Sequence, residues 1–119
     1  MEHDFQEGIG LFNSRQYFEA HEAFEVIWLR ATGKRKTLLH GLIQVAAAFH
    51  HHTRHNPAGF RSLLAKGCSK LAEIGADSEG IGLSGLMEQL HAWQKYLQQS
   101  SLRTLHAPPL PQIKPISEP

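Results

Sequence analysis

Two titratable residues stand among large apolar residues in the segment "FEAHEAFEVIW", residues 18–28. On a helical wheel that begins at Tyr17, both His21 and Glu25 fall inside the apolar arc. Burying a titratable side chain is unfavourable unless it is paired. A histidine and a glutamate on an apolar face therefore predict either a functional site or a structural hydrogen-bond network.

A third residue of this kind lies in the next helical pattern, "LLHGLIQVAAAFHHHTRH", residues 38–55. His50 falls within the apolar arc of that helix. The turn between the two patterns, around Gly33, is short, so the two helices are expected to pack as antiparallel neighbours. That packing brings His50 towards His21.

Three interpretations of this group are open. In the first, His21, Glu25 and His50 form a buried hydrogen-bond network that fixes the register of the helices. In the second, the three residues bind a divalent metal such as zinc. His21 and Glu25 have the i, i+4 spacing of an HExxH helix, and Glu22 would be the general base for a metal-bound water in hydrolysis. In the third, His21 and Glu25 act as an acid–base pair without metal.

Other groups that could do chemistry have simpler interpretations. Three consecutive histidines, residues 50–52, point about 100° apart on a helix, so they cannot all bind one ion. The cations of the turn "TGKRK" could hold an anion, but such a cluster is more often a solvated turn near a helix C-terminus. Cys68 lies on an apolar face and is predicted to pack as a small hydrophobic residue.

The spacing of apolar residues predicts an all-α protein, an irregular compact bundle of about five helices around a central antiparallel helical hairpin. Asp4, followed by Glu7, resembles a capping box at the start of the first helix. Asn56 and Pro57 read as the N-cap and first residue of the fourth. The expected helices are residues 4–12, 17–31, 36–55, a fourth from Pro57 through Ile74, and a fifth with a stripe of Leu86, Leu90, Trp93 and Leu97.

The chain is expected to be one helical domain, residues 1–105, followed by a tail, residues 106–119. The tail holds five of the six prolines. It is therefore predicted to be extended and to lie on the surface.

Length and charge exclude several classes of protein. At 119 residues the chain forms one domain with a modest core. Its 12 basic and 11 acidic residues give a net charge of +1, which does not favour nucleic acid or a membrane surface. No apolar run approaches the roughly 20 residues of a membrane span, and the N-terminus lacks a signal pattern, so a cytoplasmic protein is expected. A homodimer contact through Trp28, Trp93 or the tail is one expectation.

Two longer stretches, "LFNSRQYFEAHEAFEVIWLRATG" and "LLHGLIQVAAAFHHHTRHNPAGFRSLLAKG", together resemble the bacterial family known as domain of unknown function 309. The likeness covers about residues 8–75, where an aromatic-Glu-Ala-His-Glu motif precedes a Gly-Leu-Ile-Gln helix. The resemblance implies a compact helical fold, and the family name assigns no activity. The motif includes His21, Glu22, Glu25 and His50. It adds four candidate binding residues, which are Asn13, Glu19, Trp28 and Gln44.

A weaker resemblance links "GLFNSRQYFEAHEAFEVIW" to a single tetratricopeptide helix pair. Such pairs bind peptides but need neighbours at a period of about 34 residues, and the chain contains no second copy.

Two hypotheses for function follow. The first is a divalent-metal or small polar ligand site, hydrolytic if Glu22 activates water, built by His21, Glu25 and His50 between the second and third helices. The alternative is a non-enzymatic helical interaction module in which the polar cluster is purely structural.

Overall fold

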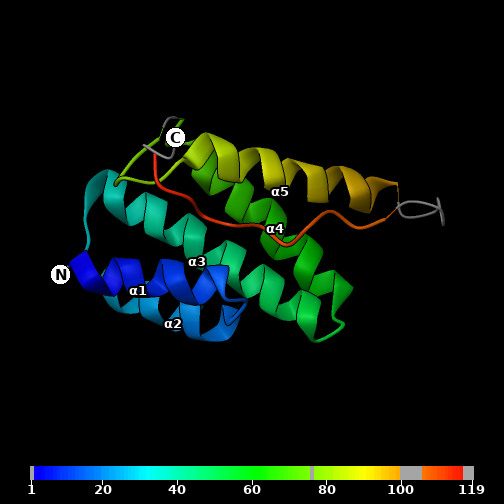
Figure 1. Cartoon of the computed structure of the whole chain (residues 1–119), viewed down its shortest axis with the longest axis horizontal. Coiled ribbons are helices and arrows are strands. Elements are labelled where there is room, and N and C mark those ends of the chain that lie inside the picture. The colour runs from blue at the N-terminus through cyan, green and yellow to red at the C-terminus, as the bar shows by residue number, and fades with distance from the viewer. Residues whose placement is uncertain (1, 76, 100–105, 117–119) are drawn as a thin grey trace.

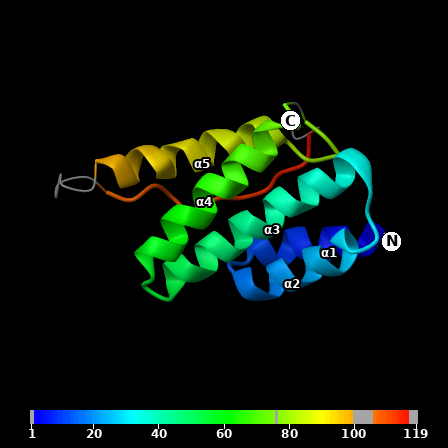
Figure 2. The ribbon, with the colours of Figure 1, turned by 180° about the vertical axis from the view of Figure 1, so that it is seen from behind.

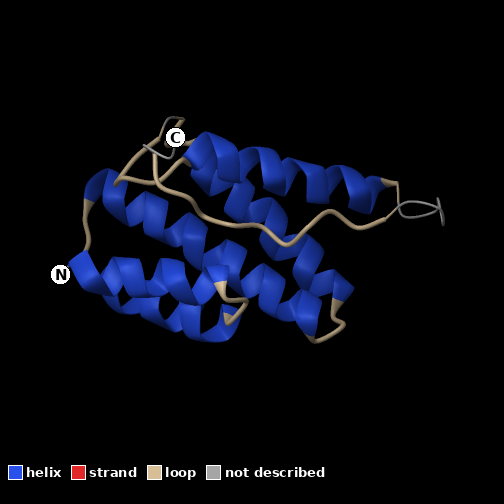
Figure 3. Ribbon diagram, in the orientation of Figure 1, coloured by secondary structure: helices blue, strands red, loops and turns tan. Residues whose placement is uncertain are grey.

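A computed structural model of the chain describes residues 2–75, 77–99 and 106–116. The regular secondary structure of these residues consists of helices, and no β-strand is present among them (Figure 3). The all-α fold predicted from the sequence is thereby confirmed. The helices are α1 (Glu2–Asn13), α2 (Tyr17–Trp28), α3 (Gly33–Thr53), α4 (Pro57–Ala72) and α5 (Leu83–Gln98).

The long helix α3 lies at the centre, with α1 and α2 on one side and α4 and α5 on the other (Figure 1). Phe49 shows why α3 is central. Its ring lies 5.7 Å from that of Tyr17 in α2, 5.0 Å from Phe60 in α4 and 5.4 Å from Trp93 in α5. Offset and edge-to-face ring contacts at such distances add to the stability gained from apolar burial. One side chain thus joins four helices in one core.

The helix boundaries follow local signals in part. Helix α2 ends at Trp28 rather than at residue 31, α3 covers Gly33–Thr53 rather than residues 36–55, and α4 ends at Ala72 rather than at Ile74. The side chain of Asn56 accepts a hydrogen bond from the backbone N–H of Gly59, and Pro57 begins α4, as predicted. The predicted cap at Asp4 is wrong, because α1 already begins at Glu2 and Asp4 lies in its first turn. A carboxylate there favours the helix through the positive end of the helix dipole, so the acidic residue still marks the N-terminus.

Helices α3 and α4 approach each other closely at two glycines. A Cβ on Gly41 would lie 2.6 Å from the Leu71 side chain, and one on Gly67 would lie 2.7 Å from that of Val45 and 3.1 Å from its backbone nitrogen. No larger residue fits this crossing without displacing a helix. The flanking side chains of the two helices are therefore held near one another.

The described part of the tail, residues 106–116, runs extended across α3 and α4 on the face seen in Figure 1 and passes behind them in Figure 2. Ile113 is buried. The backbone of Ile113 pairs with the Asn13 side chain, donating to Oδ1 at 2.7 Å and accepting from Nδ2 at 2.8 Å. Gln89 and Trp93 of α5 make further hydrogen bonds to the tail. The predicted domain boundary after residue 105 lies outside the described residues.

Among the residues that the structure describes, no helix combines the length and the apolar character needed to cross a bilayer.

Candidate functional site

Two aromatic contacts set the register between α2 and α3. The ring of Phe18 lies 5.4 Å from that of His50, and the ring of Trp28 lies 5.9 Å from that of His40. From the first contact to the second, the residue number rises by ten in α2 and falls by ten in α3. The two helices are therefore antiparallel. In this register Ala47 of α3 lies level with His21 of α2.

His21 and His50 meet at a shared neighbour, the ring of Phe18, which lies 6.0 Å from the imidazole of His21. Both histidines are half-buried. The Nδ1 atom of His21 is buried and has no hydrogen-bond partner among the residues that the structure describes. The two predicted imidazoles therefore come to one small region, where an aromatic ring links them in place of a hydrogen bond.

Glu25 does not point inward, and the expectation of a buried carboxylate is wrong. Its side chain is exposed, as are those of Glu22 and Phe18. At about 100° per residue from Tyr17, the buried side chains of α2 occupy only about 280° to 0° of the wheel, whereas the apolar arc continues to about 120°. Glu25 lies in the part of that arc that extends beyond the core.

This arrangement limits the chemistry of the predicted cluster. No group of three or more His, Cys, Asp or Glu side chains within the described ranges is arranged to hold a metal ion. The described chain also has no fully buried polar or charged residue. A sealed network of His21, Glu25 and His50 is therefore not formed in this part of the chain.

The four candidate binding residues occupy different places. Glu19 is exposed on α2, and the side chain of Asn13 hydrogen-bonds to the backbone of Ile113 in the tail. Trp28 is half-buried, with the Nζ of Lys36 4.5 Å above its ring centroid. Gln44 is half-buried on α3, and its Oε1 is a buried oxygen that has no hydrogen-bond partner within residues 2–75, 77–99 and 106–116.

The consecutive histidines each have separate neighbours. His50 packs against Phe18, and the Nδ1 of His51 lies 2.9 Å from the Nδ2 of Asn56. The ring of His52 lies 4.8 Å from that of Phe60, and burial, together with the nearby His55, lowers its pKa below the ordinary value. The rings of His50 and His51 also lie 5.9 Å apart, edge to face, so only His52 is directed to a different part of the core.

Of two further groups, Cys68 behaves as the sequence indicates, whereas the basic turn does not, because residues 34–36 lie in the first turn of α3 and not near a helix C-terminus. Cys68 is buried, and burial raises the pKa of its thiol to about 11, so it packs as an apolar residue. In the basic turn, Arg35 pairs with Glu79 and lies 5.5 Å above the ring of Phe5. Its guanidinium is therefore engaged within the molecule.

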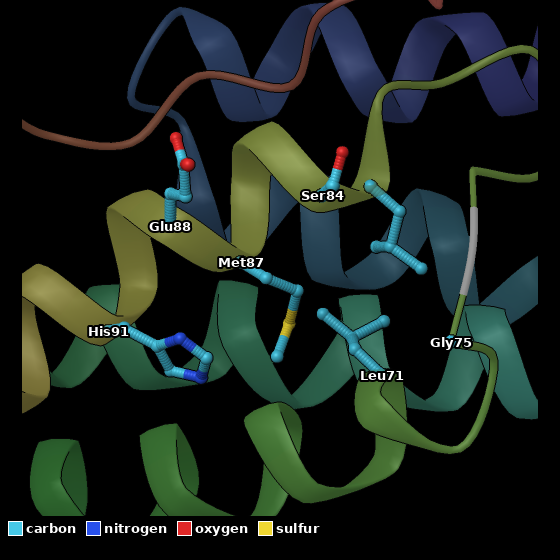
Figure 4. A pocket seen from close by; sticks show the side chains of 7 residues that line it. Leu71, Gly75, Ser84, Met87, Glu88 and His91 are labelled. Atoms are coloured by element: carbon cyan, nitrogen blue, oxygen red, sulfur yellow. The ribbon is translucent and has the colours of Figure 1, made fainter.

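A hollow of about 290 Å³ lies between α4 and α5 (Figure 4). Its polar lining residues Ser84, Glu88 and His91 are of the types that form hydrolytic triads. Figure 4 shows Met87 and His91 extending into the space, whereas the Ser84 hydroxyl and the Glu88 carboxylate point away from it. The hydroxyl of Ser84 hydrogen-bonds to Asp77. These side chains diverge, so the hollow lacks the geometry of a triad.

The sequence interpretation did not predict three exposed apolar residues of α2 and its C-cap. Phe18, Val26 and Leu29 are 47%, 53% and 67% exposed, and all three belong to α2 or its C-cap. On the wheel they lie at about 100° to 180°, opposite the buried stripe. The position of Val26 on the wheel, outside the apolar arc, is a signal in the sequence for an apolar residue on the exposed face of this helix.

Comparison with known proteins supports the family resemblance. Residues 5–63 match the family model described as Domain of unknown function (DUF309). The chain is also similar to an uncharacterized protein YpuF of Bacillus subtilis (strain 168), at 39% identity over 71 residues. That alignment covers 59% of this chain and 41% of the relative, so the chain spans less than half of the relative's length.

Proposed function

Because the chain belongs, through residues 5–63, to the DUF309 family, whose description assigns no activity, we propose a function from geometry. The protein is a non-enzymatic helical interaction module. Its docking face is the outer face of α2, defined here as Phe18, Glu22, Glu25, Val26 and Leu29. Its partner is a basic amphipathic helix.

The observation that carries the proposal is the double apolar character of α2. One stripe, which includes Tyr17 and Phe24, is buried in the core, and the opposite stripe exposes Phe18, Val26 and Leu29. A surface helix normally has one apolar stripe and a polar opposite face. A second stripe of large residues on one helix is typical of a protein-binding surface.

Charge selects the partner. Glu22 and Glu25 alternate with the apolar residues of the docking face, and their carboxylates have no cationic partner among the described residues. A helix with leucine-like residues on one face and lysines beside them supplies both the apolar contact and the countercharges.

The same charges disfavour two other occupants. A second copy of this chain, docked through the same face by twofold symmetry, would bring these carboxylates near their own equivalents. An anionic membrane surface would repel them, since helices that bind such surfaces carry lysine or arginine on the polar face.

The test uses a labelled leucine–lysine peptide designed as an amphipathic helix, with fluorescence anisotropy as the readout. We expect saturable binding that weakens with added salt. We expect at least roughly tenfold weaker binding, equivalent to about 1.4 kcal/mol, in Phe18→Ala/Leu29→Ala and in Glu22→Gln/Glu25→Gln.

Two controls make the assay specific. The first is a peptide of the same composition in an order that is not amphipathic, which should not bind. The second is Ile116→Ala, which removes an exposed apolar residue of the tail and should leave the affinity unchanged. Equal binding by the wild type and Phe18→Ala/Leu29→Ala would reject the docking face.

A divalent-ion or small polar ligand site at His21, Glu25 and His50 is the second candidate, with Glu22 as base if the site is hydrolytic. One observation favours it, the unpartnered Nδ1 of His21. Metal analysis of protein purified without an affinity tag, before and after His21→Ala, tests it. Stoichiometric metal that is lost in the variant would support this candidate, and a metal-free wild type would reject it as a metal site.

A further inference from the structure

A second hollow, of about 420 Å³, lies between α3 and α4, and none of the docking-face residues lines it. Its volume is within the range of small-molecule sites. The side chains that carry the following argument are His40 and Gln44 from α3 and Lys66, Ser69, Lys70 and Glu73 from α4.

The close helix crossing positions this hollow. Gly41 and Gly67 allow the two backbones to approach each other. The residue directly before each glycine, His40 or Lys66, lines the hollow. His40 and Gln44 are four residues apart, as are Lys66 and Lys70, so each pair lies on one face of its helix. The two helix faces thus form the two sides of the hollow, where the side chains of Lys66, Ser69 and Glu73 are exposed to solvent.

The wall from α4 is cationic. The Nζ of Lys70 lies 3.8 Å from a carboxylate oxygen of Glu73, which offsets part of its charge. The ammonium group of Lys66 has no anionic partner among the described residues. The hydroxyl of Ser69, one residue from Lys70, adds a neutral hydrogen-bond donor to the same wall.

The wall from α3 offers an acceptor that the protein does not use. The Oε1 of Gln44 is buried and no hydrogen bond reaches it from the described residues. An unsatisfied buried carbonyl is unfavourable by about 1–3 kcal/mol, so a donor supplied there by a ligand would be favourable. The buried Oε1 does not face the hollow in this structure, so the amide has to turn about its last torsion, which is broad in glutamine, to present the oxygen to a ligand.

We propose that this hollow binds a small organic phosphate that also carries a hydroxyl group. Lys66, Lys70 and Ser69 bind the phosphate, and Gln44 accepts a hydrogen bond from the hydroxyl. Phosphate is the fitting anion because lysines act as point charges towards it, whereas planar carboxylates are matched best by the fork of arginine, which is absent from the lining.

The proposal does not rest on the docking face of α2. The hollow uses side chains of α3 and α4 alone. Loss of peptide binding in the α2 variants would leave phosphate binding intact, and the reverse also holds. The two failures are therefore distinguishable.

The experiment is a titration of the isotopically labelled protein, followed by amide NMR shifts, with glycerol 3-phosphate, inorganic phosphate, glycerol and lactate as probes. Glycerol 3-phosphate should shift the amides of residues 40–44 and 66–70 saturably, and more tightly than inorganic phosphate. Glycerol should cause no shift, and lactate should bind at least tenfold more weakly. If glycerol 3-phosphate gives no saturable shift, or lactate binds as tightly, the proposal is wrong.

Three variants assign the groups. Lys66→Gln/Lys70→Gln should weaken glycerol 3-phosphate binding at least tenfold, and Lys34→Gln/Lys114→Gln, with the same change in net charge, should not. Gln44→Met should weaken glycerol 3-phosphate binding several-fold and leave inorganic phosphate unaffected. Equal affinities in the two lysine double variants would overturn the assignment of the cationic wall, and an equal loss for both probes in Gln44→Met would overturn the role of the amide.

Discussion

The crossing of α3 and α4 can be tested by adding a single methyl group to Gly67. In Gly67→Ala the new Cβ would lie 2.7 Å from the Cγ2 of Val45, 3.1 Å from the backbone nitrogen of Val45 and 3.3 Å from the carbonyl oxygen of Gly41. Carbon atoms in normal contact are about 3.5–4.0 Å apart. The valine is stiff at χ1, and the other two atoms are backbone, so the helices must move apart.

The magnitude follows from two opposing terms. Overpacking a core typically destabilises by about 1–3 kcal/mol, and two rigid backbone neighbours place Gly67→Ala in the upper part of that range. Alanine in a helix interior is favoured over glycine by about 1 kcal/mol. We therefore expect the free energy of unfolding to fall by about 1–2 kcal/mol in Gly67→Ala.

Gly10→Ala is the matched control. Gly10 lies within α1, and a Cβ there would meet nothing within 4 Å. Only the higher helix propensity of alanine over glycine then acts, so this variant should be more stable than the wild type by about 0.5–1 kcal/mol. Urea unfolding followed by far-ultraviolet circular dichroism measures both. A Gly67→Ala protein as stable as Gly10→Ala would refute the close crossing.

Three further predictions concern His52, Asn13 and Cys68. Because the pKa of His52 is lowered in the folded state, the folded protein binds fewer protons there than the unfolded chain, so stability should fall as pH drops through about 6.5 and below. His52→Phe should reduce this loss in thermal unfolding between neutral and mildly acidic pH, and His106→Phe should not. Asn13→Ala should lower the free energy of unfolding by about 1–2 kcal/mol and speed hydrogen exchange at the Ile113 amide, whereas unchanged exchange would contradict the pairing with the tail. Cys68 should react with a thiol reagent only at the rate of unfolding, and fast labelling of the native protein would contradict its burial.

Local signals in the sequence predicted the fold well. The spacing of apolar residues identified five helices, and Asn56 with Pro57 marked the start of α4 correctly. Those signals depend on neighbours within one or two turns, which a single sequence contains. The first helix was placed too late because an acidic residue is favourable both as an N-cap and in the first turn.

The candidate site was predicted only in part, because a helical wheel does not show where the core ends. His21 and His50 do come to the same ring, that of Phe18, whereas Glu25 lies outside the core. An apolar arc has the same pattern whether its residues are buried in the core or exposed to solvent, so the wheel does not predict that Phe18 is exposed.

Long-range pairings had no signal in the sequence pattern at all. Asn13 was singled out as a binding residue through the family resemblance, and it binds the backbone of Ile113 in the tail. The hollow beside Lys66 and Lys70 also depends on the crossing of α3 and α4. The i, i+4 spacing of these two lysines, together with the glycines Gly41 and Gly67, is the sequence feature that could have indicated it.

The most direct test of the proposed function locates the bound peptide. Amide NMR shifts of the labelled protein should change, on addition of the amphipathic leucine–lysine peptide, along the docking face of α2 from Phe18 to Leu29. Shifts at the docking face that disappear in Glu22→Gln/Glu25→Gln are the predicted result. Shifts confined to α5 or to the tail, with α2 unaffected, would contradict it.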